Sequence, residues 1–349
     1  MNRPKSRILI AASILLVCYS LFVYGAFHVS SNILSKDVSK ETHVFSTLSD
    51  ATIGVATSSF VATEEVEGTI LFVGDIMLSR AIGSIMEKKQ DWTYPFLQVQ
   101  EVLSSADLTF GNLEGPISDK GANIGSIYSF RANPKSVEGL SFAGFDVVSI
   151  ANNHMWDYGR AAFLDTLSIL SSKQIAYVGG GENYLKAHTP VIRDVRGTKV
   201  AFLAYTNLLP PFLGRIDAAP SVAFHDSEQM TLDIIDAKKV ADVVVVSFHF
   251  GEEYKTIHNA YQEKIAHTAV DAGASIVIGH HPHVIQDVEV YKGAYIAYSL
   301  GNFIFDQNFS LDTSKGMVVT ITFKDKKIID FATSTVQFNA TFQPSFVNK

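Results

Sequence analysis

Cysteine and basic residues are scarce in this chain of 349 residues. Its single cysteine, Cys18, excludes an intramolecular disulfide bond, and a chain that is 47% hydrophobic has enough apolar material for a core without one. The chain has 28 Lys and Arg against 35 Asp and Glu, and three of the basic residues precede the first apolar run. The remainder is therefore acidic, which argues against nucleic acid as the main partner because a phosphate backbone calls for a basic surface.

The first apolar run, residues 8–27, contains no charged residue and follows Arg3, Lys5 and Arg7. At about 1.5 Å per residue it is long enough to cross a hydrocarbon core of roughly 30 Å. The basic flank favours a cytoplasmic tail at 1–7, a transmembrane signal-anchor at 8–27 and an extracytoplasmic location for the rest. A cleaved signal peptide is the alternative, although Tyr24 and Phe27 make a poor cleavage site.

Residues 28–68 are rich in Ser and Thr, lack proline and show no sustained apolar period. Such a segment buries too little surface to offset its conformational entropy, so we expect a flexible stalk. The folded domain is expected to comprise residues 69–349.

Short β-branched runs alternate with helix-like stretches along this domain, and the pattern predicts an α/β fold with mostly buried strands. Two further apolar runs, 316–323 and 327–338, flank a charged turn and predict a C-terminal β-hairpin. The other predicted strands are 69–74, 146–150, 175–178, 200–205, 243–248, 275–278 and 294–299, and the predicted helices are 79–89, 134–143, 161–172, 228–239 and 259–272.

Polar residues follow six of the apolar runs. In open α/β sheets, ligands bind beyond the carboxyl ends of the strands, so these residues are candidates for one site. Five of the eleven histidines lie at these positions. The residues are Asp75, Asn112 and Glu114, Asn152 to His154, His249 and Glu252, His280 to His283, and Asn302.

Each position also has a purely structural interpretation. His281 and His283 form a His-x-His pair whose imidazoles can share a face and bind one or two ions, or they are two surface histidines in a polar loop. Asp75 is either a carboxylate ligand or the N-cap of the next helix. Glu114 is either a site residue or a solvated surface charge. His249 is either a ligand or a histidine at the edge of the core whose ring nitrogens are hydrogen-bonded.

Seven sequence blocks resemble the CapA family of poly-gamma-glutamate (capsule) synthesis proteins, whose domain is similar to the calcineurin-like metallophosphoesterases. The order and joint presence of the blocks make the resemblance specific. It implies a layered sandwich of central β-sheets flanked by helices. The blocks are VGDIMLSR (73–80), NLEGPIS (112–118), FDVVSIANNHMWDYG (145–159), YVGGGEN (177–183), HFGEEY (249–254), HPHVIQ (281–286) and YSLGNFIFD (298–306).

The resemblance also implies roles for single residues around divalent metal ions, with manganese, zinc, calcium and iron as candidates. One ion would be held by Asp75 and His283, and the other by Asn153, His249 and His281. Glu114 would bridge the two ions, and His154 would protonate the leaving group. The phosphoesterase pattern has a histidine where this chain has Met77, which leaves the first ion one ligand short. The expected substrate-binding residues are Asn112, Asn152, Glu252 and Asn302.

The family implies a part in synthesis, export or attachment of an anionic polymer such as poly-gamma-glutamate, alongside membrane-embedded capsule synthesis subunits. Metal-assisted hydrolysis or transfer is the reaction expected of an enzyme with this site. Two alternatives remain open at this point: a non-catalytic polymer-binding or assembly subunit, and a generic metal-dependent phosphoesterase.

Overall fold

The computed structural model describes residues 67–124, 127–208 and 217–347. The predicted cytoplasmic tail, the apolar segment 8–27 and nearly all of the predicted stalk lie outside these ranges. Within the described ranges no helix has the length and apolar character needed to span a membrane.

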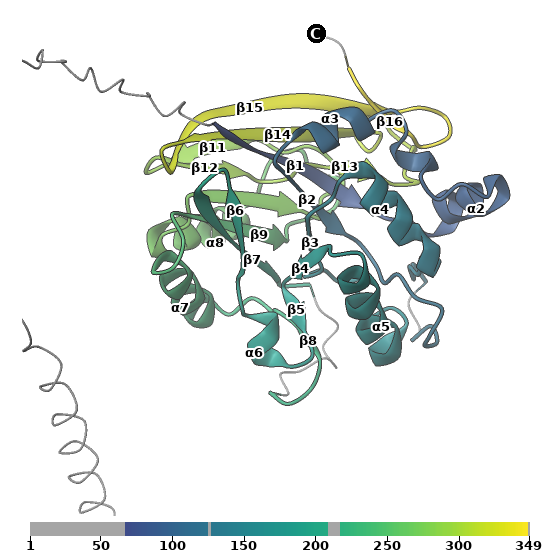
Figure 1. The fold of residues 1–349 in the computed structure, drawn as a ribbon, viewed down its shortest axis with the longest axis horizontal. Coiled ribbons are helices and arrows are strands. Elements are labelled where there is room, and N and C mark those ends of the chain that lie inside the picture. The colour runs from purple at the N-terminus through teal and green to yellow at the C-terminus, as the bar shows by residue number, and fades with distance from the viewer. Residues whose placement is uncertain (1–66, 125–126, 209–216, 348–349) are drawn as a thin grey trace, which may run out of the picture. The chain divides into compact units, whose positions relative to one another are not determined.

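The described chain forms two mixed β-sheets and a small two-stranded one (Figure 1). The first large sheet has eight strands in the order β16-β15-β14-β1-β2-β3-β4, and β13 also pairs with β1. Strands β1 to β4 and β13 run parallel, whereas β14 to β16 are antiparallel. Its strands are β1 (Gly68–Ile76), β2 (Leu108–Leu113), β3 (Val147–Ser149), β4 (Ala176–Val178), β13 (Asn302–Ile304), β14 (Lys315–Lys324), β15 (Lys327–Phe338) and β16 (Pro344–Phe346).

The second large sheet has six strands in the order β11-β12-β10-β9-β7-β6. The four central strands are parallel and the two edge strands antiparallel. They are β6 (Val191–Val195), β7 (Thr198–Thr206), β9 (Val243–His249), β10 (Ile276–His280), β11 (Val288–Tyr291) and β12 (Ala294–Ala297), and the small sheet pairs β5 (Gly180–Gly181) with β8 (Ser221–Val222).

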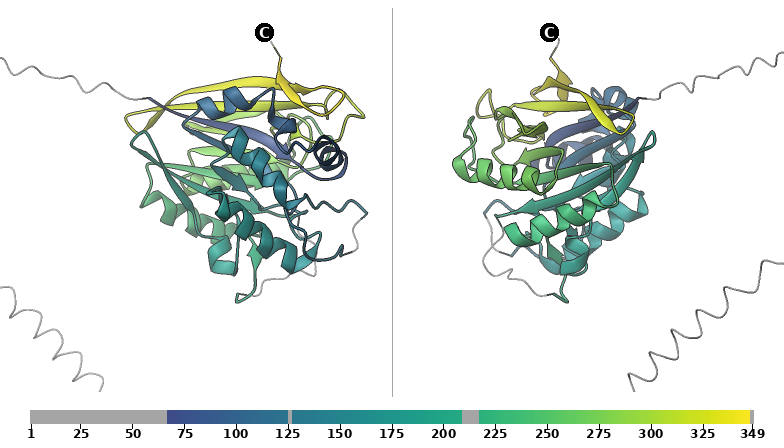
Figure 2. Two further views of the ribbon diagram at one scale, coloured as in Figure 1. Left: turned by 45° about the vertical axis from the view of Figure 1, so that its right-hand side comes forward. Right: turned by 90° about the vertical axis from the view of Figure 1, so that its left-hand side faces the viewer.

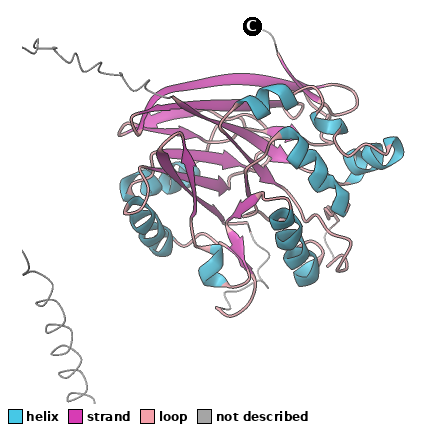
Figure 3. Ribbon diagram, viewed as in Figure 1, coloured by secondary structure: helices cyan, strands magenta, loops and turns pink. Residues whose placement is uncertain are grey.

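Helices flank the strands, as the cyan and magenta ribbons of Figure 3 show. Residues of α2 to α5 pack in the same apolar cluster as one face of the first sheet, and residues of α7 and α8 pack against the second sheet. The helices are α2 (Arg80–Lys89), α3 (Gln100–Ser105), α4 (Val137–Ala143), α5 (Gly159–Ser172), α6 (Tyr184–Ala187), α7 (Ser227–Lys238) and α8 (Ala260–Ala272), with 3-10 turns η1 (Tyr94–Phe96) and η2 (Pro134–Ser136).

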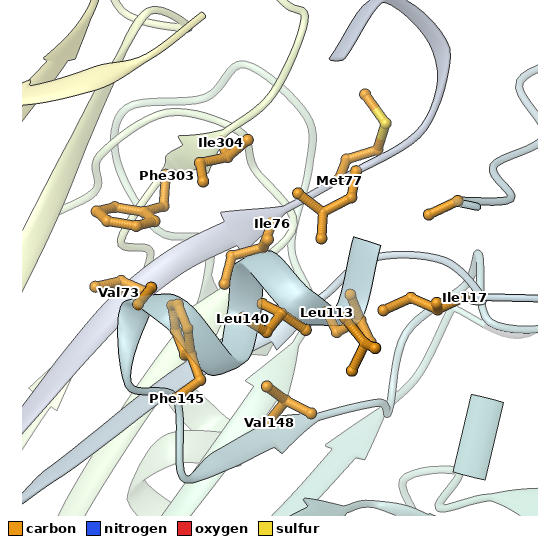
Figure 4. Close-up of a cluster of buried hydrophobic side chains, with 14 of the residues drawn as sticks. Val73, Ile76, Met77, Leu113, Ile117, Leu140, Phe145, Val148, Phe303 and Ile304 are labelled. Atoms are coloured by element: carbon orange, nitrogen blue, oxygen red, sulfur yellow. The ribbon is translucent and has the colours of Figure 1, made fainter. Parts of the chain in front are cut away.

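The alternation of side chains along the strands explains this layering. In β1, Leu71 and Val73 enter the helix-side cluster, while Ile70 and Phe72 point into a second cluster shared by both sheets. Figure 4 shows part of the helix-side cluster, including Val73. The strands of the second sheet alternate in the same way between the shared cluster and the cluster beneath α7 and α8. The result is a four-layer α/β/β/α sandwich (Figure 2).

The predicted α/β layers and the C-terminal hairpin are confirmed, and β14 and β15 pair along their whole length. Several details differ from the prediction. The segment 134–143 begins as a 3-10 turn before α4. The elements that were not predicted include β2, β6, β11, β13, β16 and α3. The edge strands β6 and β11 lack an apolar run because β6 has one buried residue and β11 none. Asn302, which was expected in the loop after the run 294–299, begins a further strand, β13, which pairs with β1 opposite Asp75.

Candidate functional site

The candidate site lies where the carboxyl ends of parallel strands from both sheets meet. The first sheet supplies Asp75 at the end of β1 and Glu114 after β2. The second supplies His249 at the end of β9, and the turn that follows β10 supplies His281 and His283. All five side chains are buried, although every one of them is an ionisable group. Buried groups of this kind need partners, so their contacts determine what the site can do.

Asp75 connects the two sheets. Its Oδ1 accepts a hydrogen bond from Asn112 Nδ2 at 2.8 Å, and its Oδ2 accepts one from the backbone N–H of His281 at 3.2 Å. Two imidazole nitrogens, His280 Nδ1 and His283 Nδ1, lie 3.4 Å from its oxygens. Asp75 does not cap α2, whose N-terminal Ala81 N–H instead donates to Asp306 at 3.2 Å.

Glu114 faces the same space from β2. Its Oε2 accepts a weak 3.4 Å hydrogen bond from Asn112 Nδ2, and its Oε1 lies 3.6 Å from His283 Nε2 and 3.9 Å from His154 Nε2. Within the described chain this Oε1 is buried and accepts no hydrogen bond. The solvated-charge interpretation of Glu114 is therefore wrong, because its side chain is 1% exposed.

Two overlapping groups of possible ligand atoms share His283. One consists of Asp75, Glu114 and His283, and the other of Glu253, His281 and His283. Within each group the ligand atoms lie within 4.8 Å of one another. Glu253 is the exposed member, and the hydrogen bond from Tyr254 N–H to Pro282 O, at 2.8 Å, ties its turn to the His-x-His turn.

The electrostatics of the site follow from its burial. Burial raises the pKa of Glu114 well above its usual value, and the Asp75 charge raises it further. Burial would also raise the pKa of Asp75, but His280 and His283 outweigh it and hold that pKa well below its usual range. The carboxylates likewise outweigh burial at His283 and raise its pKa to about 9.

The pKa values of His281 and His249 are shifted in the opposite direction from that of His283. Burial and the nearby His283 charge lower the pKa of His281 to about 3. Burial and the neighbouring His281 lower that of His249 well below its usual value. A neutral imidazole is the form that binds a metal.

His154 differs from these groups because its side chain is partly exposed. Its Nδ1 lies 2.8 Å from Asp157 Oδ2, which also accepts a hydrogen bond from Phe130 N–H at 2.7 Å. The Phe130 ring stacks on the imidazole with centroids 3.9 Å apart. Held in this way, the His154 imidazole directs Nε2 toward Glu114 Oε1, 3.9 Å away.

The two neighbouring asparagines have separate positions. Asn153 Oδ1 lies 2.7 Å from His249 Nε2, so the two predicted ligands of one ion are side by side. Asn152 is fully buried, and its Nδ2 donates to Asn112 Oδ1 at 3.1 Å and to Leu113 O at 2.8 Å. Asn112 and Asn152 thus form a buried amide network that supports the carboxylates. Neither asparagine caps the following helix, because Tyr158 is the N-cap of α5.

Two predicted substrate-binding residues lie at the edge of this arrangement. Asn302 Oδ1 is 2.9 Å from His283 Nδ1, so Asn302 orients that imidazole. Glu252 is exposed, its Oε1 lies 3.5 Å from Asn259 Nδ2, and it lines a separate cavity of about 330 Å³ at the start of α8. The structure therefore brings the other predicted site residues together but sets Glu252 apart from them.

Met77 stands where the phosphoesterase pattern has a histidine. Its side chain is fully buried in the helix-side cluster (Figure 4), and its sulfur accepts hydrogen bonds from Ser79 N–H and Oγ at 3.2 and 3.0 Å. A ligand at this position would have to leave the core.

The residues present fit a divalent cation. Within the described chain Glu114 Oε1, His281 Nδ1 and both ring nitrogens of His280 are buried without a hydrogen-bond partner. Buried lone pairs are costly unless they are satisfied, and a mixed set of carboxylate and imidazole donors suits manganese, zinc or iron. The sequence analysis did not assign two residues of this site. Glu252 was chosen in place of its neighbour Glu253, and His280, the last residue of the buried strand β10, received no role.

Stacked sheets with a carboxylate and histidine cluster at their joint strand ends define an α/β protein with a candidate metal centre. The family model of the bacterial capsule synthesis protein PGA_cap matches residues 69–307, and the chain belongs to this family. This confirms the resemblance drawn from the seven sequence blocks.

Two relatives are similar to much of the chain. The capsule biosynthesis protein CapA of Bacillus anthracis is 35% identical over 264 residues, which cover 72% of this chain and 62% of that protein. The PGA biosynthesis protein CapA of Bacillus subtilis is 35% identical over 256 residues, which cover 71% of this chain and 66% of that protein. The chain thus spans less than two thirds of the length of either relative. Among solved structures, the calcineurin-like phosphoesterase YfkN of Bacillus subtilis matches 78% of this chain and 90% of its own at 16% identity, with a TM-score of 0.43.

Proposed function

We propose that this protein is a membrane-anchored, extracytoplasmic member of its family that acts in synthesis, export or attachment of an anionic capsule polymer such as poly-gamma-glutamate. The reaction is metal-assisted hydrolysis or transfer. The observation that carries this proposal is the buried cluster of Asp75, Glu114 and His283, whose ligand atoms lie within 4.8 Å of one another, together with His281 in a second group that shares His283. The relatives named for capsule and PGA biosynthesis support the choice of polymer, and the apolar segment 8–27 supports the anchor.

The residues divide into metal-holding and proton-donating groups. Asp75, Glu114 and His283 would hold one divalent ion, and Asn153, His249 and His281 would complete the second set. A bound ion would supply Lewis acidity and lower the pKa of a nucleophile. Asn112 keeps Asp75 in place through its 2.8 Å hydrogen bond.

His154 supplies the proton in this mechanism. With Nδ1–H donated to Asp157, the ring keeps one orientation, and protonated Nε2 faces the space beside Glu114. Because the His154 side chain is 13% exposed, a leaving group can approach it from solvent. The ring can then take up a proton again from water, as a general acid must.

The proposed partners are the polymer itself and the membrane-embedded subunits that make or export it. An anchor at 8–27 would keep the domain close to such subunits, and an extracytoplasmic location would place it where the finished polymer emerges.

The test uses the purified full-length chain in detergent, stripped of metal and reloaded in turn with manganese, zinc, calcium or iron. We expect at least one ion to restore cleavage or transfer of a gamma-linked glutamate polymer, followed by the change in polymer length. His281→Ala should abolish this activity, whereas His267→Ala, at a partly exposed histidine paired with Glu289, should leave it unchanged.

Two outcomes would contradict the proposed reaction. Polymer binding without turnover by any metal-loaded form would identify a non-catalytic assembly subunit. Turnover of small phosphoesters without action on the polymer would identify a generic phosphoesterase.

A further inference from the structure

A polar cavity of about 370 Å³ lies beside the candidate metal centre, and nothing in the mechanism uses it. Its walls come from the segments that follow the site residues: Leu78 to Ser84 continue from Asp75, and Ser118 and Asp119 continue from Glu114. Two arginines, Arg80 and Arg131, are its positively charged lining residues.

Arg80 is held in a fixed orientation at the cavity. Its Nε lies 3.2 Å from Asp306 Oδ2, and the Asp306 side chain is 4% exposed whereas that of Arg80 is 39% exposed. The pair joins two segments 226 positions apart. Arg80 also has a φ of 52°, a left-handed conformation that is uncommon for a residue with a side chain and carries a cost. Asp306 also accepts the Ala81 N–H at 3.2 Å, so one carboxylate holds both the Arg80 side chain and the first turn of α2.

Arg131 is also held in place. Its Nη1 donates to Lys120 O at 2.9 Å, and its guanidinium lies 4.1 Å from the centre of the Tyr158 ring. A guanidinium stacked on an aromatic ring loses little further freedom when it binds an anion.

One aromatic ring links this cavity to the proposed proton donor. Phe130 stacks on His154 with centroids 3.9 Å apart, and Arg80 Cζ lies 5.5 Å from the centre of the same ring. Arg80 and His154 therefore contact one phenyl ring. A polymer whose reacting bond lies at His154 can place a neighbouring group in the cavity.

We propose that this cavity is a subsite for a carboxylate group of the anionic polymer, bound by Arg80 and Arg131 next to the reacting bond. The inference rests on the proposed function for its choice of substrate. Guanidinium groups bind carboxylates through paired, charge-assisted hydrogen bonds. Two acids, Glu87 and Asp119, also line the cavity and reduce its net charge. Their negative charge weakens the binding of each carboxylate, which allows the polymer to dissociate from the cavity after reaction.

The test measures binding of a short gamma-linked glutamate oligomer to the full-length, metal-free chain by titration calorimetry at fixed ionic strength. Replacing either arginine, as Arg80→Ala or Arg131→Ala, should weaken binding about 10- to 100-fold, the usual effect of losing a charge-assisted pair. Asp119→Asn should tighten it about threefold, because the change removes a like charge from the cavity wall.

Arg196 provides the matched control. Its Nε lies 2.6 Å from Asp107 Oδ1, so it forms the same type of pair as Arg80 but does not line the cavity. Arg196→Ala should change affinity less than twofold. Because Arg80→Ala removes the partner of a buried carboxylate and can disturb folding, Arg131→Ala, which leaves Asp306 untouched, provides a second and independent variant.

The proposal is overturned if both cavity variants bind the oligomer like the parent, if Arg196→Ala weakens binding equally, or if the parent binds inorganic phosphate but not the oligomer. Metal retention by the parent is measured separately. A parent that binds the oligomer through the arginines but holds no metal would refute the proposed reaction and leave the subsite intact.

Discussion

Glu253 provides the sharpest test of the candidate metal centre. We predict that Glu253→Gln weakens binding of a divalent ion by about 30-fold. Its ligand atom lies within 4.8 Å of those of His281 and His283. An ion shared by these atoms would lie closer than that to the carboxylate; at about 4 Å, in a water-like dielectric suited to an exposed side chain, a carboxylate and a doubly charged ion attract each other by about 2 kcal/mol. Since 1.4 kcal/mol corresponds to a factor of ten, this energy corresponds to about 30-fold in affinity.

The neighbouring glutamate is the control for this prediction. Glu252→Gln removes the same charge from the adjacent exposed position, but its carboxylate faces Asn259 and not the imidazoles. Titration of the metal-free chain with manganese or zinc should therefore show less than a threefold change for Glu252→Gln. Equal effects of the two substitutions would refute the reasoning, since a general loss of negative charge would then explain both. An unchanged affinity in Glu253→Gln would remove Glu253 from the site.

Three further predictions concern other parts of the site and chain. His154→Asn should keep the metal content measured by elemental analysis and slow turnover about 10²- to 10⁴-fold; loss of metal would make His154 a ligand. The folded pKa of His283, about 9, exceeds the unfolded value near 6.5, so its contribution to metal-free stability is complete below pH 6.5 and is lost as pH rises toward 9. Urea unfolding should show this decline, and a His283→Gln chain that declines equally would contradict it. Protease added to whole cells should release the domain by cutting within 28–68, and protection until lysis would refute the predicted topology.

Much of the fold could be predicted because its strands are buried on both faces. Such strands read as continuous apolar runs, as in Val243 to Phe248, and the helices between them have apolar faces. Edge strands carry no such pattern: β11 alternates between exposed and half-buried residues. The sequence also did not predict which strands pair in the same sheet. The run around 294–304 divides, so that β12 joins the second sheet and β13 the first.

The site residues could be located but not all could be assigned. Asp75, Glu114 and the histidines follow buried strands, and that position alone brought them together. The choice between Glu252 and Glu253 depends instead on a turn in which Gly251 and Tyr254 both have positive φ, at 100° and 64°. Two adjacent identical residues give no indication of which one the turn directs inward. Met77 likewise enters the core because β1 has an irregular register after Asp75, which no periodicity reveals.

The contact between Asp75 and the His281 backbone joins residues 206 positions apart, and the Arg80 pair with Asp306 joins residues even farther apart. Closing loops of this length lowers the conformational entropy of the chain before any contact between the two ends can form. The two halves of the site therefore come together only once both sheets have docked. A chain in which only one sheet has folded therefore lacks an assembled centre, so metal binding should report on the completed fold and not on either sheet alone.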